Sequence, residues 1–375
     1  MILTNCAACA APLAHNAPRC VRCKVRYCNR TCQMDHWRRG HKQICKEIHR
    51  GGNAEKYHAD KKYKEAVAVA VKKCAADTKG HTCYICTEAV HWKTKEGLVR
   101  MCACRGTSGF AHVSCLAEQA KILCDEAEKN NLGLKAINKK LERWYACGLC
   151  EQYYHGVVYC ALGWACWKTY VGRPETDTAR RMAISVLALG LFDARQYKDA
   201  LSVQEAELSM LRRIGAAEEN ILVAQGNLAN TYQNIGRNED ALRMRKIVYS
   251  RTLRLHGEEY VGTLVAANNC AAVLAELKRF PEAKALLRKV IPVAQRVFGQ
   301  SHEGTFKMRW IYARALCEDA GATLDDLNEA VTTLEDIERT ARRVLGGAHP
   351  TTMGIERSLQ NSRAELRDAM ASREI

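Results

Sequence analysis

The spacing of apolar residues predicts that the second half of the chain is a stack of helices. From about residue 177 the sequence is rich in helix formers, has few breakers, and repeats itself about every 42 residues. "NLANTYQNIGRNEDAL" from residue 227 aligns with "NCAAVLAELKRFPEAK" from residue 269, and "LHGEEYVGT" from residue 255 aligns with "VFGQSHEGT" from residue 297. Each unit is therefore predicted to form a helix, a turn and a second helix.

Alanines at matched positions support this repeat. They recur at steps of 41, 42 and 42 residues in the first helix of each unit, and at steps of 41, 42 and 47 residues in the second. Small side chains at matched sites let neighbouring helices approach closely. The longer last step predicts an insertion near "GATLDD". The alanines are Ala188, Ala229, Ala271 and Ala313 in the first helices, and Ala200, Ala241, Ala283 and Ala330 in the second.

Helical patterns also occur before the repeats. Residues 54–77 contain strong helix formers with neither Pro nor Gly, which predicts a connecting helix. Residues 116–131 and 134–146 predict a helical hairpin with Gly133 near its turn.

The two most apolar stretches, 157–167 and 182–192, are eleven residues each, which is too short to cross a bilayer. The second stretch is predicted to be the buried helix of the first repeat. The start of the chain lacks the basic flank and apolar core of a secretory signal. We therefore expect a cytoplasmic and/or nuclear protein with no membrane partner.

The cysteines and the positive charge are concentrated in the first part of the chain. Sixteen of the twenty cysteines lie between Cys6 and Cys150, and in a reducing compartment paired C-x-x-C spacings are more often metal sites than disulfides. Residues 1–150 hold 27 Lys+Arg against 13 Asp+Glu, whereas the rest of the chain holds 30 against 28. The excess of positive charge in residues 1–150 permits contact with nucleic acid. Thiolates bound to zinc carry negative charge, however, and they reduce this positive excess.

Residues 6–45 contain eight metal donors at ligand spacing. Two C-x-x-C pairs precede "YCNRTCQMDHWRRGHKQIC" at 27–45, and two tetrahedral zinc ions need eight nitrogen or sulfur ligands. So short a segment cannot bury enough apolar surface to fold alone, whereas structural zinc contributes on the order of 10 kcal/mol. His36 is an alternative ligand, for which packing beside Trp37 is the favoured role. The eight donors are Cys6, Cys9, Cys20, Cys23, Cys28, Cys32, His41 and Cys45.

The order C-x-x-C, C-x-x-C, Y-C-x-x-x-C-Q, H-W and G-H-x-x-x-C resembles the MYND zinc finger over almost all of this segment. The resemblance implies that the segment binds proteins, often through proline-containing peptides, and that none of its residues is catalytic. It also implies a cross-brace, with Cys6, Cys9, Cys28 and Cys32 on one zinc ion and Cys20, Cys23, His41 and Cys45 on the other.

Residues 83–150 contain a second set of eight donors. They come from "CYIC" at 83–86, "CACRGTSGFAHVSC" at 102–115 and "CGLC" at 147–150, and again predict two zinc ions. The spacing resembles the RING-variant (RING-CH) finger. The resemblance implies that Cys83, Cys86, His112 and Cys115 hold one zinc ion and that Cys102, Cys104, Cys147 and Cys150 hold the other.

RING-variant fingers are usually the recruiting domains of ubiquitin ligases, so the resemblance also implies an activity. Such fingers bind a ubiquitin-conjugating enzyme and form no covalent intermediate themselves. Ile85 matches the apolar contact residue of the binding surface, and Leu149 is predicted to complete the groove. Two positions depart from the family: Gln119 stands where Trp is common, and Glu151 stands where active members often have a cation.

The repeats resemble tetratricopeptide repeats of the kinesin light chain type over residues 177–370, with about four repeats and a capping helix. The segment "GGAHPTT" at 346–352 matches the one that opens a new repeat. The resemblance implies that peptides bind on the concave face, where Asn227, Asn268 and Asn269 match asparagines that contact the peptide backbone. Gly226 and Ile311 interrupt that series, and the alternative is that the asparagines are only polar surface residues.

We therefore expect a mainly α protein with two small cross-brace zinc fingers before an α-helical tetratricopeptide-repeat solenoid. The predicted domains are a MYND finger at 1–50, a helical spacer at 51–80, a RING-variant finger with a helical insertion at 81–156, a connector at 157–176, and repeats with a capping helix at 177–375. Four zinc ions, two per finger, are expected.

Three functional hypotheses follow from these modules. The first is a RING-variant ubiquitin ligase whose repeats and MYND finger recruit protein partners. The alternative is a non-catalytic scaffold or adaptor with the same three binding modules, and the third is a basic nucleic-acid-associated regulator. No residue is predicted to be catalytic, and the sequence has no phosphate-binding loop, H-E-x-x-H or Gly-rich dinucleotide turn.

Overall fold

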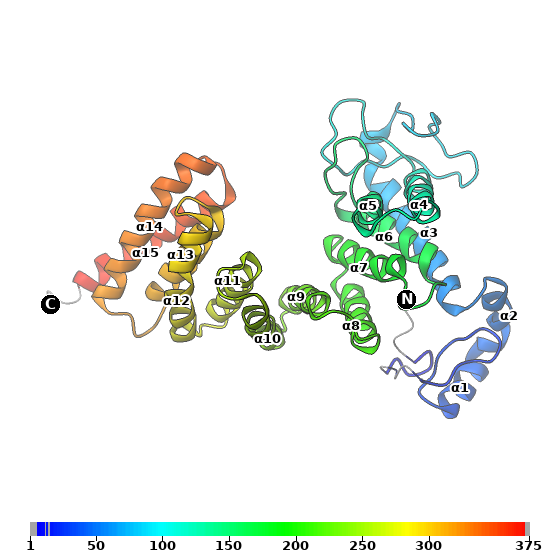
Figure 1. Ribbon diagram of the computed structural model, residues 1–375, viewed down its shortest axis with the longest axis horizontal. Helices are drawn as coiled ribbons and strands as arrows, with labels where there is room; N and C mark the ends of the chain where they lie inside the picture. The colour runs from blue at the N-terminus through cyan, green and yellow to red at the C-terminus, as the bar shows by residue number, and fades with distance from the viewer. Residues whose placement is uncertain (1–5, 12, 14–15, 372–375) are drawn as a thin grey trace. The chain divides into compact units, whose positions relative to one another are not determined.

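The computed structural model describes residues 6–11, 13 and 16–371. In this range the chain is nearly all helical, and its contacts divide it into two compact units, Met1–Ala217 and Glu218–Ile375 (Figure 1). The predicted fold class, a mainly α chain with a cysteine-rich region before helical repeats, is confirmed. None of the described helices has the length and apolar character needed to cross a bilayer.

The first unit contains both cysteine-rich modules and the first helix pair of the repeats. Only isolated β-bridges occur in its described part, between residues such as Val99 and Ala111. Its helices are α1 (Arg30–His36), a π-turn (Trp37–His41), α2 (Lys42–Arg50), α3 (Ala54–Thr78), α4 (Val113–Lys129), α5 (Leu134–Leu141), a short 3-10 turn (Glu142–Trp144), α6 (Gly156–Tyr170), α7 (Thr178–Asp193) and α8 (Tyr197–Arg213). The hairpin of α4 and α5 turns beside Gly133, as the sequence predicts.

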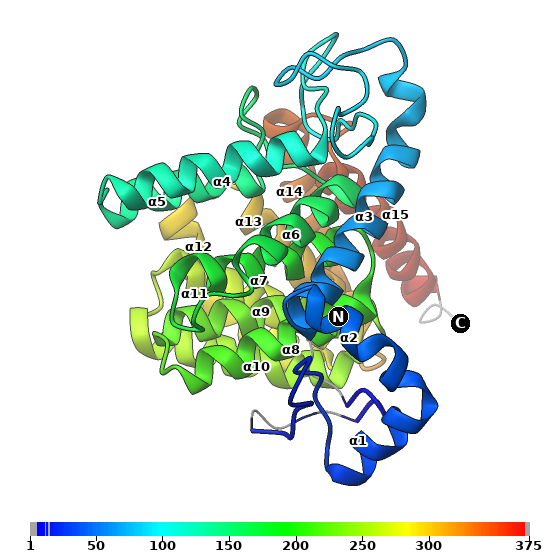
Figure 2. The ribbon, with the colours of Figure 1, turned by 90° about the vertical axis from the view of Figure 1, so that its right-hand side faces the viewer.

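Helix α6 forms the centre of the first unit. It packs against α3, α4 and α7 (Figure 2), and its apolar side chains are buried around the whole helix. The sequence analysis treated residues 157–176 as a connector, because a helix buried on every side shows no amphipathic period. Cys160 and Cys166 lie inside α6 at 1% and 0% exposure and join none of the metal-binding groups found among the described residues.

Two glycines allow α6 and α7 to approach backbone to backbone. A Cβ atom added to Gly163 of α6 would lie 2.9 Å from the Cα atom of Leu187. A Cβ atom added to Gly190 of α7 would lie 2.8 Å from the carbonyl oxygen of Tyr159. Both distances are shorter than real Cβ atoms show, so a side chain at either position would clash with the backbone of the facing helix. The close approach of α6 and α7 therefore requires glycine at both positions.

The second unit consists of three helix pairs and a final helix. They are α9 (Glu218–Asn234), α10 (Asn238–His256), α11 (Val261–Glu276), α12 (Phe280–Phe298), α13 (Glu303–Cys317), α14 (Leu324–Leu345) and α15 (Pro350–Ala371). The matched alanines are buried where helices meet: every one of the eight is at most 2% exposed. The predicted insertion lies at residues 318–323 between α13 and α14, where Thr323 and Asp326 form a capping box.

The junctions between repeats have a common geometry. Gly257, Gly299 and Gly346 each end a helix with φ between 82° and 90°, which favours glycine. The hydroxyl of Thr263 donates to the carbonyl oxygen of Gly257 at 2.8 Å, and the hydroxyl of Thr305 donates to that of Gly299 at 2.9 Å. These bonds close the first two junctions, whereas the hydroxyl of Thr352, at the same spacing from Gly346, is buried without a hydrogen-bond partner.

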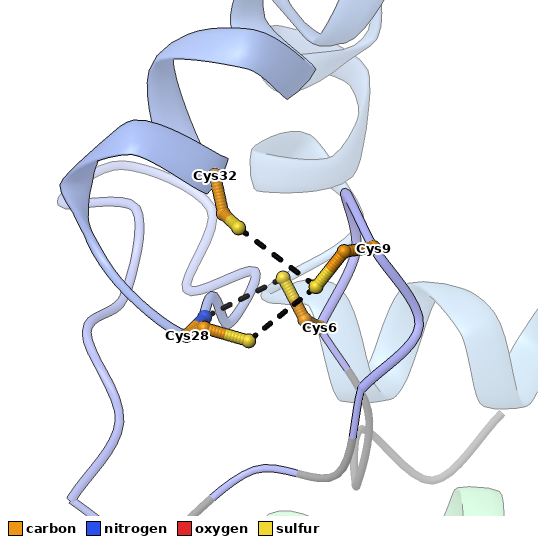
Figure 3. A group of neighbouring side chains, drawn as sticks. All are labelled: Cys6, Cys9, Cys28 and Cys32. Carbon is orange, nitrogen blue, oxygen red and sulfur yellow. Dashed lines mark hydrogen bonds between the residues drawn. The ribbon is translucent and has the colours of Figure 1, made fainter.

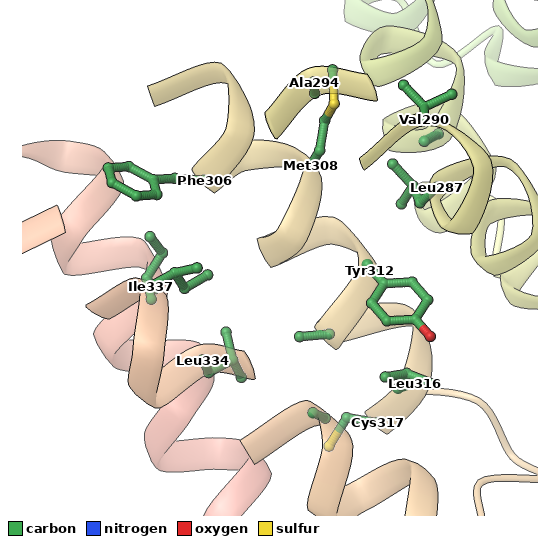
Figure 4. Close-up of a cluster of buried hydrophobic side chains, with 14 of the residues drawn as sticks. Leu287, Val290, Ala294, Phe306, Met308, Tyr312, Leu316, Cys317, Leu334 and Ile337 are labelled. Atoms are coloured by element: carbon green, nitrogen blue, oxygen red, sulfur yellow. The ribbon is translucent and has the colours of Figure 1, made fainter. Parts of the chain in front are cut away.

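The core of the second unit runs along the later helix pairs. Leu287 and Val290 of α12 pack with Phe306 and Tyr312 of α13 and with Ile337 of α14 (Figure 4). Burying side chains of this size contributes about 1.5–3 kcal/mol each, so this unit needs no metal to fold.

A buried carboxyl in α8 gives the first unit a pH dependence. Glu207 is 5% exposed, burial raises its pKa to about 7, and the hydroxyl of Ser185 that donates to it lowers the pKa only in part. The pKa of Glu207 is higher in the folded than in the unfolded chain, so the folded chain favours the protonated carboxyl. The stability that this protonation contributes is fully present below about pH 4.5 and is lost as pH rises through 7.

We therefore expect Glu207→Gln to raise the free energy of unfolding at pH 8 by about 2–3 kcal/mol, and to have no effect below about pH 4.5. Urea unfolding of the wild type and of Glu207→Gln at matched pH values measures the difference in the free energy of unfolding. Any loss of zinc in acid affects both proteins equally and therefore does not contribute to this difference. Glu205→Gln, an exposed neighbour on α8, is the control. A difference that does not change with pH would contradict the prediction.

Candidate metal centres

The structure brings the sixteen predicted donors together in four groups of four. Within each group one ligand atom from every residue lies within 4.8 Å of the others. The groups are Cys6, Cys9, Cys28 and Cys32; Cys20, Cys23, His41 and Cys45; Cys83, Cys86, His112 and Cys115; and Cys102, Cys104, Cys147 and Cys150. Each group joins two segments that are far apart in sequence, and all the cysteines are free thiols.

The first group is the most accessible to solvent. Figure 3 shows its four sulfur atoms pointing toward one another, with Cys32 contributed by α1. The sulfur of Cys9 lies 3.5 Å from that of Cys28 and 3.8 Å from that of Cys32. Cys9 is exposed, whereas Cys6 is buried and receives the backbone N–H of Cys28 at 3.4 Å.

The second group is buried at all four positions. The sulfur atoms of Cys20 and Cys45 are 3.8 Å apart, and Nε2 of His41 lies 3.3 Å from the sulfur of Cys23. His36 is not part of the group, because its Nδ1 lies 3.0 Å from the hydroxyl of Tyr27 and its ring stacks on His41. His36 therefore forms a hydrogen bond to Tyr27 and packs on His41, rather than beside Trp37.

The two groups of the second module interleave along the chain. Nδ1 of His112 lies 3.3 Å from the sulfur of Cys86 and 3.6 Å from that of Cys115. In the other group the sulfur atoms of Cys104 and Cys147 are 3.7 Å apart. The Cβ of a side chain at Gly109 would lie 2.6 Å from the Cβ atom of Cys104, so the turn between the donors requires a glycine.

All four C-x-x-C pairs have the same backbone conformation. In each, the residue after the second cysteine has a positive φ of 56–64° and donates its N–H to the carbonyl oxygen of the first cysteine at 2.8–3.1 Å. The first cysteine in turn donates its N–H to the residue five positions later at 2.7–3.0 Å. We call this turn a knuckle; the residues with positive φ are Ala10, Lys24, Thr87 and Glu151.

The knuckles direct backbone N–H groups at the first sulfur of each pair. The N–H of Ile85 donates to Cys83 and that of Leu149 donates to Cys147, both at 3.4 Å. For Cys6, burial opposes ionisation, but backbone N–H groups outweigh it and lower the pKa to about 6. For Cys147, the thiol of Cys102 and then the backbone N–H groups lower the pKa to about 4.

The remaining donors show why each group needs a cation. Burial raises the pKa of Cys23 to about 12, and it also raises the pKa of Cys115. Burial lowers the pKa of both His41 and His112, so both rings are neutral and can offer a lone pair. A bound dication stabilises all of the thiolates of a group together.

The distances fit zinc. A tetrahedral ion with Zn–S bonds of about 2.3 Å separates its sulfur ligands by roughly 3.8 Å and a sulfur from a histidine nitrogen by roughly 3.5 Å. Four sulfur–sulfur distances are 3.5–3.8 Å and three sulfur–nitrogen distances are 3.3–3.6 Å, and all donor atoms of a group lie within 4.8 Å of one another. The donor sets, three or four thiols with at most one imidazole, are those of structural zinc sites.

A groove of about 840 Å³ lies beside the third group. Ile85 and Gln119 line it, together with Tyr63 of α3, Trp92 and Lys168 of α6. Tyr63, Trp92 and Lys168 could not be assigned to this groove from the sequence, because only the packing of α3 and α6 against the second module brings these positions together.

The other two residues singled out in the second module lie outside this groove. Leu149 is 51% exposed on the fourth knuckle but does not line the groove. Glu151 is exposed and follows the last donor directly.

The three candidate peptide-contacting asparagines are half-buried on the first helices of two successive repeats. Asn227 lies on α9, and Asn268 and Asn269 lie on α11. The side-chain oxygen of Asn268 is buried without a hydrogen-bond partner. Beside Asn227, the guanidinium of the buried Arg245 of α10 donates to the carbonyl oxygen of Gly226 at 3.3 Å. Helix α9, which carries Asn227, is therefore packed against a buried charged side chain.

Two family models match the chain. One is the MYND finger, at residues 6–45, and the other is the tetratricopeptide repeat, at residues 220–296. Among curated proteins, Ubiquitin C-terminal hydrolase 15 of Oryza sativa subsp. japonica is 54% identical over 44 residues, which are 12% of this chain and 4% of that protein. Ubiquitin carboxyl-terminal hydrolase 17 of Arabidopsis thaliana is 44% identical over 54 residues, 14% of this chain and 7% of that protein. The chain thus spans a small fraction of the curated relatives it matches.

Solved structures with similar repeats include TPR-like repeats assigned to a kinesin light chain of Podosopora anserina. That chain is 17% identical, with a TM-score of 0.43, and the match covers 62% of this chain and 98% of that one. BtubC (BKLC) of P. vanneervenii is 14% identical with a TM-score of 0.33, covering 69% of this chain and 91% of that one. The repeat assignment rests on the helix pairs and on the family match at residues 220–296.

The chain therefore combines zinc-binding sites, a MYND finger and tetratricopeptide repeats. Modules of both kinds generally mediate contacts between proteins.

Proposed function

We propose that residues 83–150 form a RING-variant finger that recruits a ubiquitin-conjugating enzyme, while the MYND finger and the repeats select protein partners. The observation that carries the proposal is the interleaving of two zinc-type groups, of which the third group borders a groove lined by Ile85. On this proposal the protein binds four zinc ions, two per finger, with the MYND finger at 1–50, the RING-variant finger at 81–156 and the repeats from residue 177. The predicted connector at 157–176 is instead mostly helix α6 of the first unit.

The local geometry supports a docking role for the groove. Ile85 is half-buried at the tip of the third knuckle, and its backbone N–H is held by the sulfur of Cys83. The facing wall is the start of α4, whose first turn is fixed by His112 and Cys115. A metal-anchored knuckle and a metal-anchored helix give the groove a rigid shape, which reduces the entropy lost when a partner binds.

No side chain of this module needs to react with ubiquitin. In the proposed reaction an amine of a lysine attacks the thioester carbonyl of the charged conjugating enzyme, an amide bond forms, and the thiol of that enzyme leaves. The finger only holds the charged enzyme in a reactive geometry.

Two residues favour the alternative, a scaffold without transferase activity. Gln119 puts a polar amide on the groove wall, and the exposed carboxylate of Glu151 cannot donate the bridging hydrogen bonds that a cation supplies. The experiment below separates the two functions.

We expect the wild-type protein to accelerate discharge of ubiquitin onto free lysine from at least one member of a panel of charged conjugating enzymes by roughly tenfold or more. Ile85→Ala removes the apolar contact and should abolish the acceleration with zinc content unchanged. Cys83→Ser should abolish it with loss of zinc. Val69→Ala, an exposed change on α3 outside the groove, is the matched control and should behave as wild type.

Discharge that the wild type leaves unchanged across the whole panel would reject the ligase and leave the scaffold. Acceleration that persists in Ile85→Ala would place the contact elsewhere on the protein.

A further inference from the structure

Residues 91–96 have the backbone of a zinc knuckle but contain no cysteine. The N–H of His91 donates to the carbonyl oxygen of Glu96 at 3.0 Å, and the N–H of Lys95 donates to the carbonyl oxygen of His91 at 2.9 Å. Lys95 has a φ of 59°. These bonds and this positive φ occur at the same spacing in all four metal-binding knuckles, with His91 at the place of the first cysteine and Thr94 at the place of the second.

Side-chain hydrogen bonds hold this metal-free knuckle in place of a zinc ion. Nδ1 of His91 accepts the backbone N–H of Thr94 at 3.1 Å and lies 2.9 Å from the hydroxyl of Thr94. The carboxylate of Glu96 then accepts the backbone N–H and the hydroxyl of Ser114, at 2.7 and 2.6 Å. The loop is thereby fastened to the first turn of α4 by side chains, and within the described part of the chain it has no metal ligand of its own.

The metal-free knuckle presents a large aromatic side chain to solvent. Trp92 is 69% exposed and lines the same groove as Ile85. Ile122 of α4 lines the groove as well and is 46% exposed. A tryptophan on a rigid support, beside a pocket and next to other apolar groups, is the kind of residue that dominates the energy of protein interfaces.

We propose that the metal-free knuckle is a second contact site for the conjugating enzyme, with Trp92 as an aromatic anchor beside Ile85. The inference rests on the proposed function, because it takes the occupant of the groove from it. The groove is continuous from Ile85 to Trp92, so a partner seated on Ile85 also covers Trp92. Gln119 on the same wall offers an amide in place of an apolar group, which leaves Trp92 as the largest apolar side chain available to that partner.

The test compares Trp92→Ala with Val90→Ala in the full-length, zinc-loaded protein. Val90 lies on the same loop and is 54% exposed, but it does not line the groove. We expect Trp92→Ala to weaken the affinity for the conjugating enzyme, measured by titration calorimetry, at least about tenfold, and Val90→Ala to change it less than about twofold. Zinc content by native mass spectrometry should equal that of the wild type in both variants.

A second measurement does not depend on loss of affinity. A photo-crosslinking amino acid at position 92 should trap the conjugating enzyme, and the same amino acid at position 90 should not. Wild-type affinity of Trp92→Ala together with impaired Ile85→Ala would overturn this inference and leave the proposed function standing. Absence of binding by the wild type to every conjugating enzyme in the panel would overturn both.

Discussion

Removal of zinc with a strong chelator is expected to unfold both cysteine-rich modules and to leave the helices of Glu218–Ile375 intact. The core of the first module consists largely of the ligands themselves, including Cys20, Cys23 and Cys45 beside Tyr27 and Ile48. Structural zinc contributes about 10 kcal/mol or more of coupled folding energy, which so small a core cannot replace. The second unit has an apolar core of its own and holds none of the metal-binding groups found in the described part of the chain.

Hydrogen exchange followed by mass spectrometry checks this expectation segment by segment. Residues 6–45 and 83–112 should exchange fully after chelation, whereas α11 to α14 should stay protected. Cys45→Ser and Cys124→Ser form a matched pair, because both side chains are 1% exposed and only the first belongs to a metal group. The first variant should lose zinc and the second should keep it. Protection of both modules after chelation would show that metal is not what holds them.

Substitution of Gly190 by alanine is expected to destabilise the first unit by about 2–4 kcal/mol. The added methyl group would meet the backbone of Tyr159 and Cys160 at 2.8–3.0 Å, and backbone atoms cannot rotate away as a side chain does. Helices α6 and α7 would have to separate, which weakens the contact between the centre of the unit and its first repeat. Gly163→Ala should have a similar effect from the other side of the contact.

Gly226→Ala provides the control for this prediction. Gly226 also lies within a helix, α9, but a Cβ atom added there meets nothing within 4 Å. Because alanine is the better helix former, this change should stabilise the second unit by up to about 1 kcal/mol. Urea unfolding of the three variants measures the effects, and equal stability of Gly190→Ala and wild type would refute the close contact.

The features that the sequence could predict are those encoded by local spacing. The repeat was visible because the matched alanines all serve the same purpose, burial between helices, at a constant step. All sixteen donors were visible because zinc ligands need a fixed residue type at a fixed spacing, as in Cys83 and Cys86. The place of the insertion followed from the changed step between Ala283 and Ala330.

The features that the sequence could not predict depend on contacts between distant segments. Helix α6 has no amphipathic period because it is covered on every side, so its central place was not visible. The metal-free knuckle has no cysteine, and hydrogen bonds between His91 and Thr94 leave no recognisable spacing. The groove joins the second module to Tyr63 and Lys168, and only the packing of α3 and α6 brings these parts together.

The close contact between α6 and α7 bears on how such a chain can change in evolution. A helix pair beyond residue 217 could be duplicated or lost as a unit, since Gly257, Gly299 and Gly346 give these helices the same positive-φ end. The first pair cannot be exchanged for another in this way, because Gly190 is matched to Gly163 of a helix that also lines the groove through Ala165 and Lys168. Any replacement for α7 would have to preserve this contact, which ties the first helix pair to the unit that holds the zinc modules.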